Sequence, residues 1–218
     1  MKVYVATKNA GKLREMEALF AEAPFELRSF AEYEDPLEGD VSYADNAALK
    51  ARALHAQLQR AGTPAHVLAD DSGLEVYALD RRPGVLTAYY GGAALPWPER
   101  RKKLLAELRE ALARNATLDR RARFVCALHF VDAHGRELAT MGTVDGEIAA
   151  EERGEAGFSF DPVFLYAPAG RTFAEMSAEE KNQVSHRGIA AAALVAAISR
   201  AGIDRYTERS TEKNDPVA

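Results

Sequence analysis

Two adjacent carboxylates, Asp70 and Asp71, follow a short apolar run and precede Ser72 and Gly73. The apolar run, residues 65–69, predicts a strand, and successive strand residues point to opposite faces, so the two carboxylates cannot have the same role. Carboxylates at the end of a buried strand are costly to desolvate unless a cation or hydrogen-bond donors meet them. One of them facing a cleft would suit Mg²⁺, which takes one or two protein carboxylates together with water and phosphate oxygens. An Asp-Ser-Gly turn, with Asp70 accepting bonds from backbone N–H groups, fits the same residues.

The segment from Thr7 to Lys12 joins a predicted strand, residues 3–6, to a predicted helix. Unpaired N–H groups at a helix N-terminus form a natural phosphate site. Gly11 lets the backbone approach an anion closely, and Lys12 adds a positive charge. The spacing matches neither a Walker loop nor a dinucleotide-binding glycine fingerprint. An ordinary strand-to-helix turn capped by Thr7 or Asn9 is the alternative.

A long helix is predicted to begin at Ser42 and to end at Gly62. Ser42 with an acidic residue three positions later, Asp45, forms a capping box, which is enough to explain both residues. In the alternative, Asp45 faces the cleft as a second metal ligand. Asn46 and Lys50 lie one helical turn apart, so both side chains can project toward the same site.

Two further segments carry groups that could contact a ligand. Phe158 could stack on a base and Asp161 could accept hydrogen bonds from ring N–H groups, although a Gly/Pro turn with core phenylalanines also explains this segment. Ser185 is predicted as the N-cap of the last helix, which places His186 and Arg187 in its first turn. Positive side chains there oppose the helix dipole. Their unfavourable position favours a role that faces a ligand.

The composition predicts an ordinary soluble globular protein, with 47% hydrophobic and 28% charged residues in a chain of 218. The net charge of −5 argues against a partner that is a nucleic acid polymer. The single cysteine, Cys126, cannot form an internal disulfide and indicates a reducing compartment. No signal peptide and no apolar run of membrane-spanning length is present in the sequence. We therefore expect a cytoplasmic protein with no membrane partner.

The mixture of strands and helices predicts an α/β protein with at least one antiparallel hairpin. Strands are expected at residues 3–6, 25–30, 65–69, 122–131, 137–148 and 163–166. Helices are expected to begin after Gly11 and at Ser42, Pro98 and Ser185. The hairpin is the pair of strands that flank Asp132 to Gly135. Residues from about Tyr206 onward are polar and aperiodic, so we expect them to fray.

Four of these segments, in this order and with this spacing, resemble the motifs of the inosine triphosphate pyrophosphatase family. The matching segments are Thr7-x-Asn9-x-x-Lys12-x-x-Glu15, Asp45-Asn46-Ala47-x-x-Lys50-Ala51, Ala69-Asp-Asp-Ser-Gly-Leu74 and Ser185-His-Arg187. Each motif is common alone, but the set is specific. The resemblance extends from Thr7 to about Ile198, which is nearly the whole chain.

The resemblance implies an elongated mixed β-sheet with flanking helices that form two lobes around a central cleft. Residues 1–205 would form this single two-lobed domain, and residues 206–218 a flexible C-terminal tail. It also implies a homodimer and Mg²⁺-dependent hydrolysis of ITP, dITP or XTP, small-molecule nucleotides, to the monophosphate and pyrophosphate. Two alternatives stay open: a pyrophosphatase for other modified or ordinary triphosphates, and a non-catalytic nucleotide-binding protein.

The resemblance further assigns roles to residues. Asp71 is expected to be catalytic, orienting or deprotonating the water that attacks the α-phosphorus in line, and Asp45 and Asp71 are expected to bind the metal. The residues expected to bind substrate are Thr7, Lys8, Asn9, Ala10, Gly11, Lys12, Lys50, Ser72, Phe158, Ser159, Phe160, Asp161, Lys181, His186 and Arg187. Arg187 or His186 would donate to the 6-oxo group that distinguishes hypoxanthine and xanthine from adenine.

Three positions depart from the family pattern. The family usually has Glu where this chain has Asp45, whose shorter side chain would reach a metal through water. The Phe-Gly-Tyr-Asp of the family is replaced by residues 158–161, Phe-Ser-Phe-Asp, so one hydroxyl near the base is lost. An Arg common in the family is Tyr89 here, and we leave this position out of the expected site.

Overall fold

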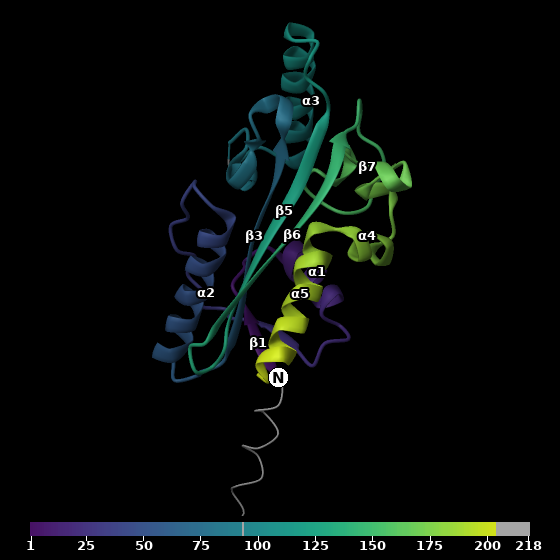
Figure 1. Cartoon of the computed structure of the whole chain (residues 1–218). Helices are drawn as coiled ribbons and strands as arrows, with labels where there is room; N and C mark the ends of the chain where they lie inside the picture. The colour runs from purple at the N-terminus through teal and green to yellow at the C-terminus, as the bar shows by residue number, and fades with distance from the viewer. Residues whose placement is uncertain (93, 204–218) are drawn as a thin grey trace, which may run out of the picture.

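An eight-stranded mixed sheet runs through the part of the chain that the computed structural model describes, residues 1–92 and 94–203 (Figure 1). The predicted tail, residues 206–218, lies outside the described residues. The strand order is β2-β1-β3-β5-β6-β7-β8, with β4 paired to β3. The strands are β1 (Lys2–Val5), β2 (Glu26–Ser29), β3 (His66–Val76), β4 (Arg82–Pro83), β5 (Arg121–Val131), β6 (Glu137–Ile148), β7 (Phe164–Tyr166) and β8 (Arg171–Thr172). The neighbours β2, β1 and β3 are parallel, and the pairs from β3 to β8 are antiparallel, which confirms the predicted mixed sheet.

Helices flank both faces of this sheet. They are α1 (Ala10–Leu19), α2 (Tyr43–Arg60), α3 (Trp97–Arg114), α4 (Ala178–Val184) and α5 (His186–Ala201). In the half of the molecule that contains β1, α2 covers one face, and α1 and α5 cover the other (Figure 1). The helix α3 packs at the opposite end of the long strands, in the half that contains β7 (Figure 1). The elongated, two-lobed shape follows from the length of β3, β5 and β6, which reach into both halves.

Each lobe has its own apolar core, because each helix buries one stripe against the sheet. Leu194 and Ile198 of α5 pack with Met16 of α1 against Val3 and Val5 of β1. On the other face, Leu54 and Leu58 of α2 pack against Val67 and Ala69 of β3. The second lobe buries Leu104 and Leu108 of α3 with Phe124, Phe160 and Phe164. Of the described helices, none is long and apolar enough to cross a membrane.

The strand β3 continues beyond the two carboxylates, to Val76. The predicted strand end near residue 69 and the alternative Asp-Ser-Gly turn are therefore both wrong. The long partner β5 explains the difference: Asp70 pairs with Leu128 and Asp71 with Ala127 in an unbroken antiparallel ladder. This pairing keeps the chain extended through Asp70 and Asp71, so no turn forms at these residues.

The other predicted strands and helices are present, with ends that differ by a few residues. Ser42 caps α2 by accepting a bond from the Asp45 N–H group, and Ser185 caps α5 by accepting one from Gly188. The hairpin of β5 and β6 is antiparallel and closes at residues 132–135. The short elements α4, β4 and β8 were not predicted, because two to seven residues show too few turns of a pattern to reveal a period.

Candidate active site

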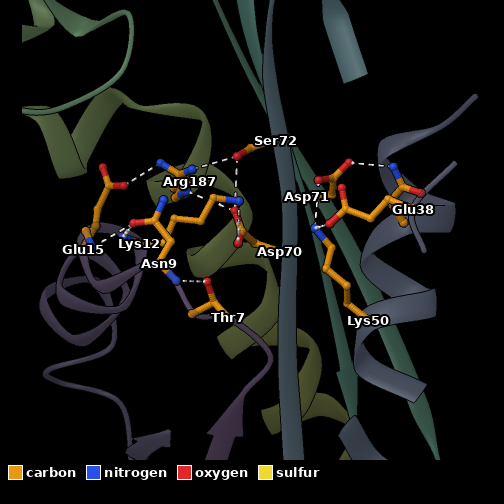
Figure 2. Close-up of polar contacts among 12 residues, drawn as sticks. Thr7, Asn9, Lys12, Glu15, Glu38, Lys50, Asp70, Asp71, Ser72 and Arg187 are labelled. Atoms are coloured by element: carbon orange, nitrogen blue, oxygen red, sulfur yellow. Dashed lines mark hydrogen bonds and ion pairs between the residues drawn. The ribbon is translucent and has the colours of Figure 1, made fainter. Parts of the chain in front are cut away.

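The strand β3 sends its two carboxylates to opposite faces of the sheet, as the alternation of strand side chains predicts (Figure 2). Asp70 shares its face with Leu68, which packs with α1 and α5. Asp71 shares its face with Ala69, which packs with α2. Both carboxylates are buried, at 2% and 5% exposure, so each depends on the cations that its own face supplies.

Asp70 is held by two cations from α1 and α5. Lys12 Nζ lies 3.1 Å from Oδ1, while Arg187 Nε and the Ser72 hydroxyl donate to Oδ2 at 3.3 and 3.2 Å (Figure 2). Burial acts to raise the pKa of Asp70, but the charges of Lys12 and Arg187 outweigh it and hold this pKa well below its usual range. The lowered pKa favours the charged form of Asp70, which joins the sheet to α1 and α5.

Asp71 faces a different group of partners on α2 and on the loop before it. Lys50 Nζ donates to Oδ1 at 2.9 Å, and Asn46 Nδ2 donates to Oδ2 at 3.3 Å. Glu38 binds the same Lys50 ammonium at 3.0 Å (Figure 2). Burial raises the pKa of Asp71 above its ordinary value even though Lys50 opposes the shift. A carboxylate with a raised pKa is a stronger base than an exposed one.

A cavity opens between these groups and the second lobe. Its lining comes from α1, α2, β3, the 3₁₀ segment η2 (Gly84–Tyr89), the start of α3, residues 158–161 and the start of α5. The predicted site residues that line it are Asn9, Lys12, Lys50, Asp71, Ser72, Phe158, Ser159, Asp161, His186 and Arg187. Segments far apart in the sequence thus meet at one cavity, whose lining includes carboxylates, such as Asp71, and cations, such as Lys50.

The predicted phosphate loop lies at one edge of this cavity. Asn9 is the N-cap of α1, and its side-chain oxygen accepts bonds from the N–H groups of Gly11 and Lys12 at 2.9 and 3.2 Å. The capping alternative is therefore present in the structure, with Asn9 rather than Thr7 as the cap. Thr7 instead accepts a bond from the Asn9 N–H group at 3.1 Å. An anion at this helix end would meet Lys12 and would compete with the Asn9 side chain.

Other residues of this loop face away from the cavity. Lys8 is exposed and pairs with Asp35 at 3.4 Å, and Ala10 is exposed at the start of α1. Gly11 lines a second cavity between α1 and α4. The loop thus brings two of its predicted residues, Asn9 and Lys12, into the main cavity.

The opposite wall is the turn from Phe158 to Asp161. The Asp161 carboxylate accepts a bond from the Phe158 N–H group at 2.8 Å and one from Lys181 Nζ at 2.9 Å. Burial raises the pKa of Asp161, and Lys181 opposes the shift. The Phe158 ring lines both cavities and lies 5.2 Å from the Lys181 ammonium and from the Arg187 guanidinium. An aromatic face held by two cations is suited to a flat, electron-rich ligand.

The first turn of α5 carries two buried polar side chains. Arg187 donates to Glu15 and Ser72 as well as to Asp70, which compensates a positive charge at a helix N-terminus. The ring of His186 stacks on Phe124, at 4.7 Å and 11°. Burial, together with Arg187 and Lys181, lowers the pKa of His186 well below its usual value, so the ring is neutral. Its Nδ1 atom is buried without a partner among the described residues, which leaves it ready for a ligand contact.

The structure places Asp45 and Phe160 elsewhere than expected. Asp45 lines hollows on the outer side of α2 with Arg52, and it does not line the cavity that holds Asp71. The reason is helical geometry: Asn46 and Lys50 share one face of α2, and Asp45 is rotated away from it by about 100°. Phe160 is fully buried and contacts Trp97 and Tyr90, so it belongs to the core of the second lobe.

Several residues of the cavity or its ion pairs were not among the predicted site residues, and Glu15, Glu38 and Tyr89 are three of them. Glu15 is bound to Arg187 and Lys181, one helical turn beyond Lys12, and this spacing could have identified it. Glu38 stands in a loop with several other acidic residues, and a loop has no periodicity that would single it out. Tyr89 lines the cavity from η2.

Comparison with known proteins finds close relatives over most of the chain. The model of the Ham1 family matches residues 3–197. The chain is 45% identical over 190 residues to the dITP/XTP pyrophosphatase of Geobacillus kaustophilus. The aligned residues cover 85% of this chain and 88% of that protein. It is 43% identical over 199 residues to a dITP/XTP pyrophosphatase of Thermus thermophilus, with 90% and 91% covered.

Solved structures agree with these relatives. A HAM1 protein from Coxiella burnetii superposes with a TM-score of 0.77 at 33% identity, over 92% of this chain and 99% of that one. The Ham1 protein of Staphylococcus aureus superposes with a TM-score of 0.76 at 32% identity, over 91% and 98%. The fold is thus shared with solved proteins of similar sequence.

Proposed function

The chain is a member of the Ham1 family, and on this premise we propose that it hydrolyses the non-standard purine triphosphates ITP, dITP and XTP to the monophosphate and pyrophosphate. Its relatives carry the name dITP/XTP pyrophosphatase, which agrees with the family expected from the four motifs. The proposal for this chain is supported by the combination of carboxylates, cations and an aromatic wall in one cavity.

The observation that carries the proposal is the position of Asp71. Its carboxylate lies in the cavity, is bound to Lys50, and has a raised pKa. We assign Asp71 to orient or deprotonate the water that attacks the α-phosphorus, with pyrophosphate as the leaving group. Phosphoryl transfer of this kind depends mostly on positioning and charge neutralisation, and Lys12 and Lys50 supply positive charge at this cavity.

The residues present fit Mg²⁺, and we propose that Asp71 and Glu38 hold it. Both carboxylates bind one ammonium, that of Lys50, so two anionic groups already converge on a single cationic position. Magnesium uses one or two protein carboxylates and takes its other ligands from water and phosphate. Asp45, the other expected ligand, lines a different hollow. When bound, the ion would neutralise charge on the phosphate oxygens.

The purine base is proposed to lie against the turn from Phe158 to Asp161. The Phe158 ring would stack on the base, while Arg187 and the neutral His186 would donate to the 6-oxo group. Adenine presents an N–H donor at this position, which would leave buried donors facing one another and can reduce the rate by up to about 10⁴–10⁵-fold. Arg187→Ala is expected to weaken the binding of ITP and to narrow the difference in kcat/KM between ITP and ATP.

A pyrophosphate-release assay tests the proposal. ITP, XTP and dITP should release pyrophosphate in the presence of Mg²⁺, whereas ATP should react slowly. Addition of EDTA should stop the reaction. Release from ATP at the rate of ITP would contradict the substrate class, and the absence of release from every nucleotide would favour a nucleotide-binding protein instead.

Asp71→Asn is the decisive variant. It keeps the size of the side chain and removes its charge, so the fold should persist while turnover of ITP falls by at least about 10³-fold, the loss expected when a general base and a metal ligand are removed together. Asp80→Asn is the matched control, because Asp80 lies in a turn beyond β3 and does not line the cavity. Near-normal turnover by Asp71→Asn would refute the catalytic assignment.

We also propose that the protein is a cytoplasmic homodimer that acts on free nucleotides rather than on a nucleic acid polymer. The homodimer is expected from the family resemblance. Sedimentation equilibrium should give twice the mass of one chain, and a monomer mass at micromolar concentration would contradict this part of the proposal.

A further inference from the structure

Two adjacent arginines at the start of α3 bind two different segments of the cavity wall. Arg100 is buried, and its guanidinium donates to the carbonyl oxygens of Leu95, Ala88 and Gly92. Ala88 belongs to the η2 wall of the cavity. Because successive helical residues point about 100° apart, Arg101 is directed elsewhere, toward the turn that contains Phe158 and Asp161.

Arg101 binds this second wall segment at Ser159 and also pairs with Glu152, which does not line the cavity. Its Nη1 atom donates to the Ser159 carbonyl oxygen at 3.0 Å, and its Nε atom donates to a Glu152 carboxylate oxygen at 2.8 Å. The side chain is 12% exposed, so both interactions are partly shielded from water. Charge-assisted bonds from a planar guanidinium fix geometry better than bonds from a flexible ammonium.

The carbonyl that Arg101 holds belongs to a strained residue. Ser159 has φ +59°, in the left-handed region that non-glycine residues rarely occupy. A strained backbone persists where its surroundings fix it, and such residues cluster at functional sites. Ser159 itself lines the cavity, next to Phe158. Arg101 thus binds the residue with unfavourable backbone geometry that directly follows Phe158 in the chain.

We propose that Arg101 is a positioning residue for the base of the substrate. By binding the Ser159 carbonyl it holds Phe158 and Asp161 at the cavity wall where a purine can stack. This inference rests on the proposed function and adds a residue to it. Arg101 contacts neither Asp71 nor Lys50, which are held by β3 and α2, so it should act on the binding of the base and not on the chemical step.

Arg101→Met tests the inference, because methionine keeps much of the apolar stem and removes every donor. We expect KM for ITP to rise by about 10-fold, the loss of a bond to a charged group, while kcat changes by less than about 2-fold. Inorganic triphosphate has no base, so its inhibition constant should stay unchanged. The matched control is Lys102→Met, the next residue, which is exposed and paired with Glu99 within α3.

A second variant distinguishes positioning from a general loss of stability. Glycine adopts positive φ without strain, so Ser159→Gly in the Arg101→Met background should recover most of the loss in KM. Arg101→Lys should recover part of it through a single bond. An unchanged KM in Arg101→Met, an equal weakening of inorganic triphosphate, or a failure of Ser159→Gly to recover KM would each overturn the inference.

The result also separates this inference from the proposed function. If the wild-type protein releases no pyrophosphate from ITP, the proposed function itself fails. If the wild type is active and Arg101→Met binds ITP normally, the function stands and the positioning role of Arg101 is refuted.

Discussion

At the scale of single residues, the cavity shows how one strand gives two neighbouring aspartates opposite properties. Asp70 meets Lys12 and Arg187, which stabilise its charged form beyond the cost of burial. Asp71 pairs with Lys50, which also pairs with Glu38. Burial raises the pKa of Asp71. Since the two residues differ only in the face to which they point, the contrast comes from the helices on each side of the sheet.

A prediction about pH follows from the Lys50–Asp71 pair. The proposed role of Asp71 requires its charged form, so kcat/KM should fall as the pH decreases through the pKa of this carboxyl. Lys50 acts to lower that pKa against the effect of burial. Lys50→Gln removes the positive charge that lowers the pKa of Asp71. The acidic limb of the profile of kcat/KM against pH should therefore move to higher pH, and the overall rate should fall.

Lys50→Arg is the control for this prediction, because it keeps the positive charge beside Asp71. Its acidic limb should lie close to that of the wild type. A limb that stays in place in Lys50→Gln, or that moves to lower pH, would show that another group controls the acidic side of the profile.

At the scale of elements, the sequence predicted most helices and strands because each long element carries a periodic apolar pattern or a recognisable cap. The alternation that separates Asp70 from Asp71 was predictable for the same reason. Two features of the site could not be predicted from the sequence. The length of β3 depends on its pairing with the equally long β5, and the inclusion of Glu38 in the cavity depends on a loop that has no pattern. Both are set by tertiary contacts rather than by local sequence.

The contact between β6 and α5 carries a prediction at this scale. Gly142 lies where the start of α5 crosses β6, and a Cβ atom there would lie 2.2 Å from the His186 carbonyl oxygen and 2.6 Å from the Ala190 nitrogen. These are backbone atoms, so Gly142→Ala must displace the helix that positions His186 and Arg187. We expect a loss of about 1–3 kcal/mol in the free energy of unfolding and a higher KM for ITP.

Thr143→Ala is the matched control, because Thr143 is the next residue of β6 and its side chain is exposed. It should change the free energy of unfolding, measured by urea denaturation, by less than about 0.5 kcal/mol. A Gly142→Ala protein as stable as the wild type, with an unchanged KM, would mean that α5 can shift without cost to the site.

At the scale of the whole molecule, the cavity exists only when both lobes are folded and in place. One side is built by α1, α2 and β3, and the other by η2, the start of α3 and residues 158–161. The same long strands, β3 and β5, pass through both lobes, so one continuous sheet connects the elements that build the two walls (Figure 1). A ligand that contacts both walls should therefore stabilise the entire fold against unfolding, because it binds the folded state alone.

This stabilisation can be measured with the inactive Asp71→Asn protein, which does not consume its ligand. At an ITP concentration of 100 times its Kd, binding should add about 2.7 kcal/mol to the free energy of unfolding. For a chain of this size, that corresponds to a rise in Tm of about 5–11 °C. ATP at the same concentration should raise Tm by much less, since its base presents a donor to the donors of Arg187 and His186. Equal rises in Tm with ITP and ATP would show that binding does not distinguish the two bases. No rise with either would show that the cavity between the lobes is not the nucleotide site.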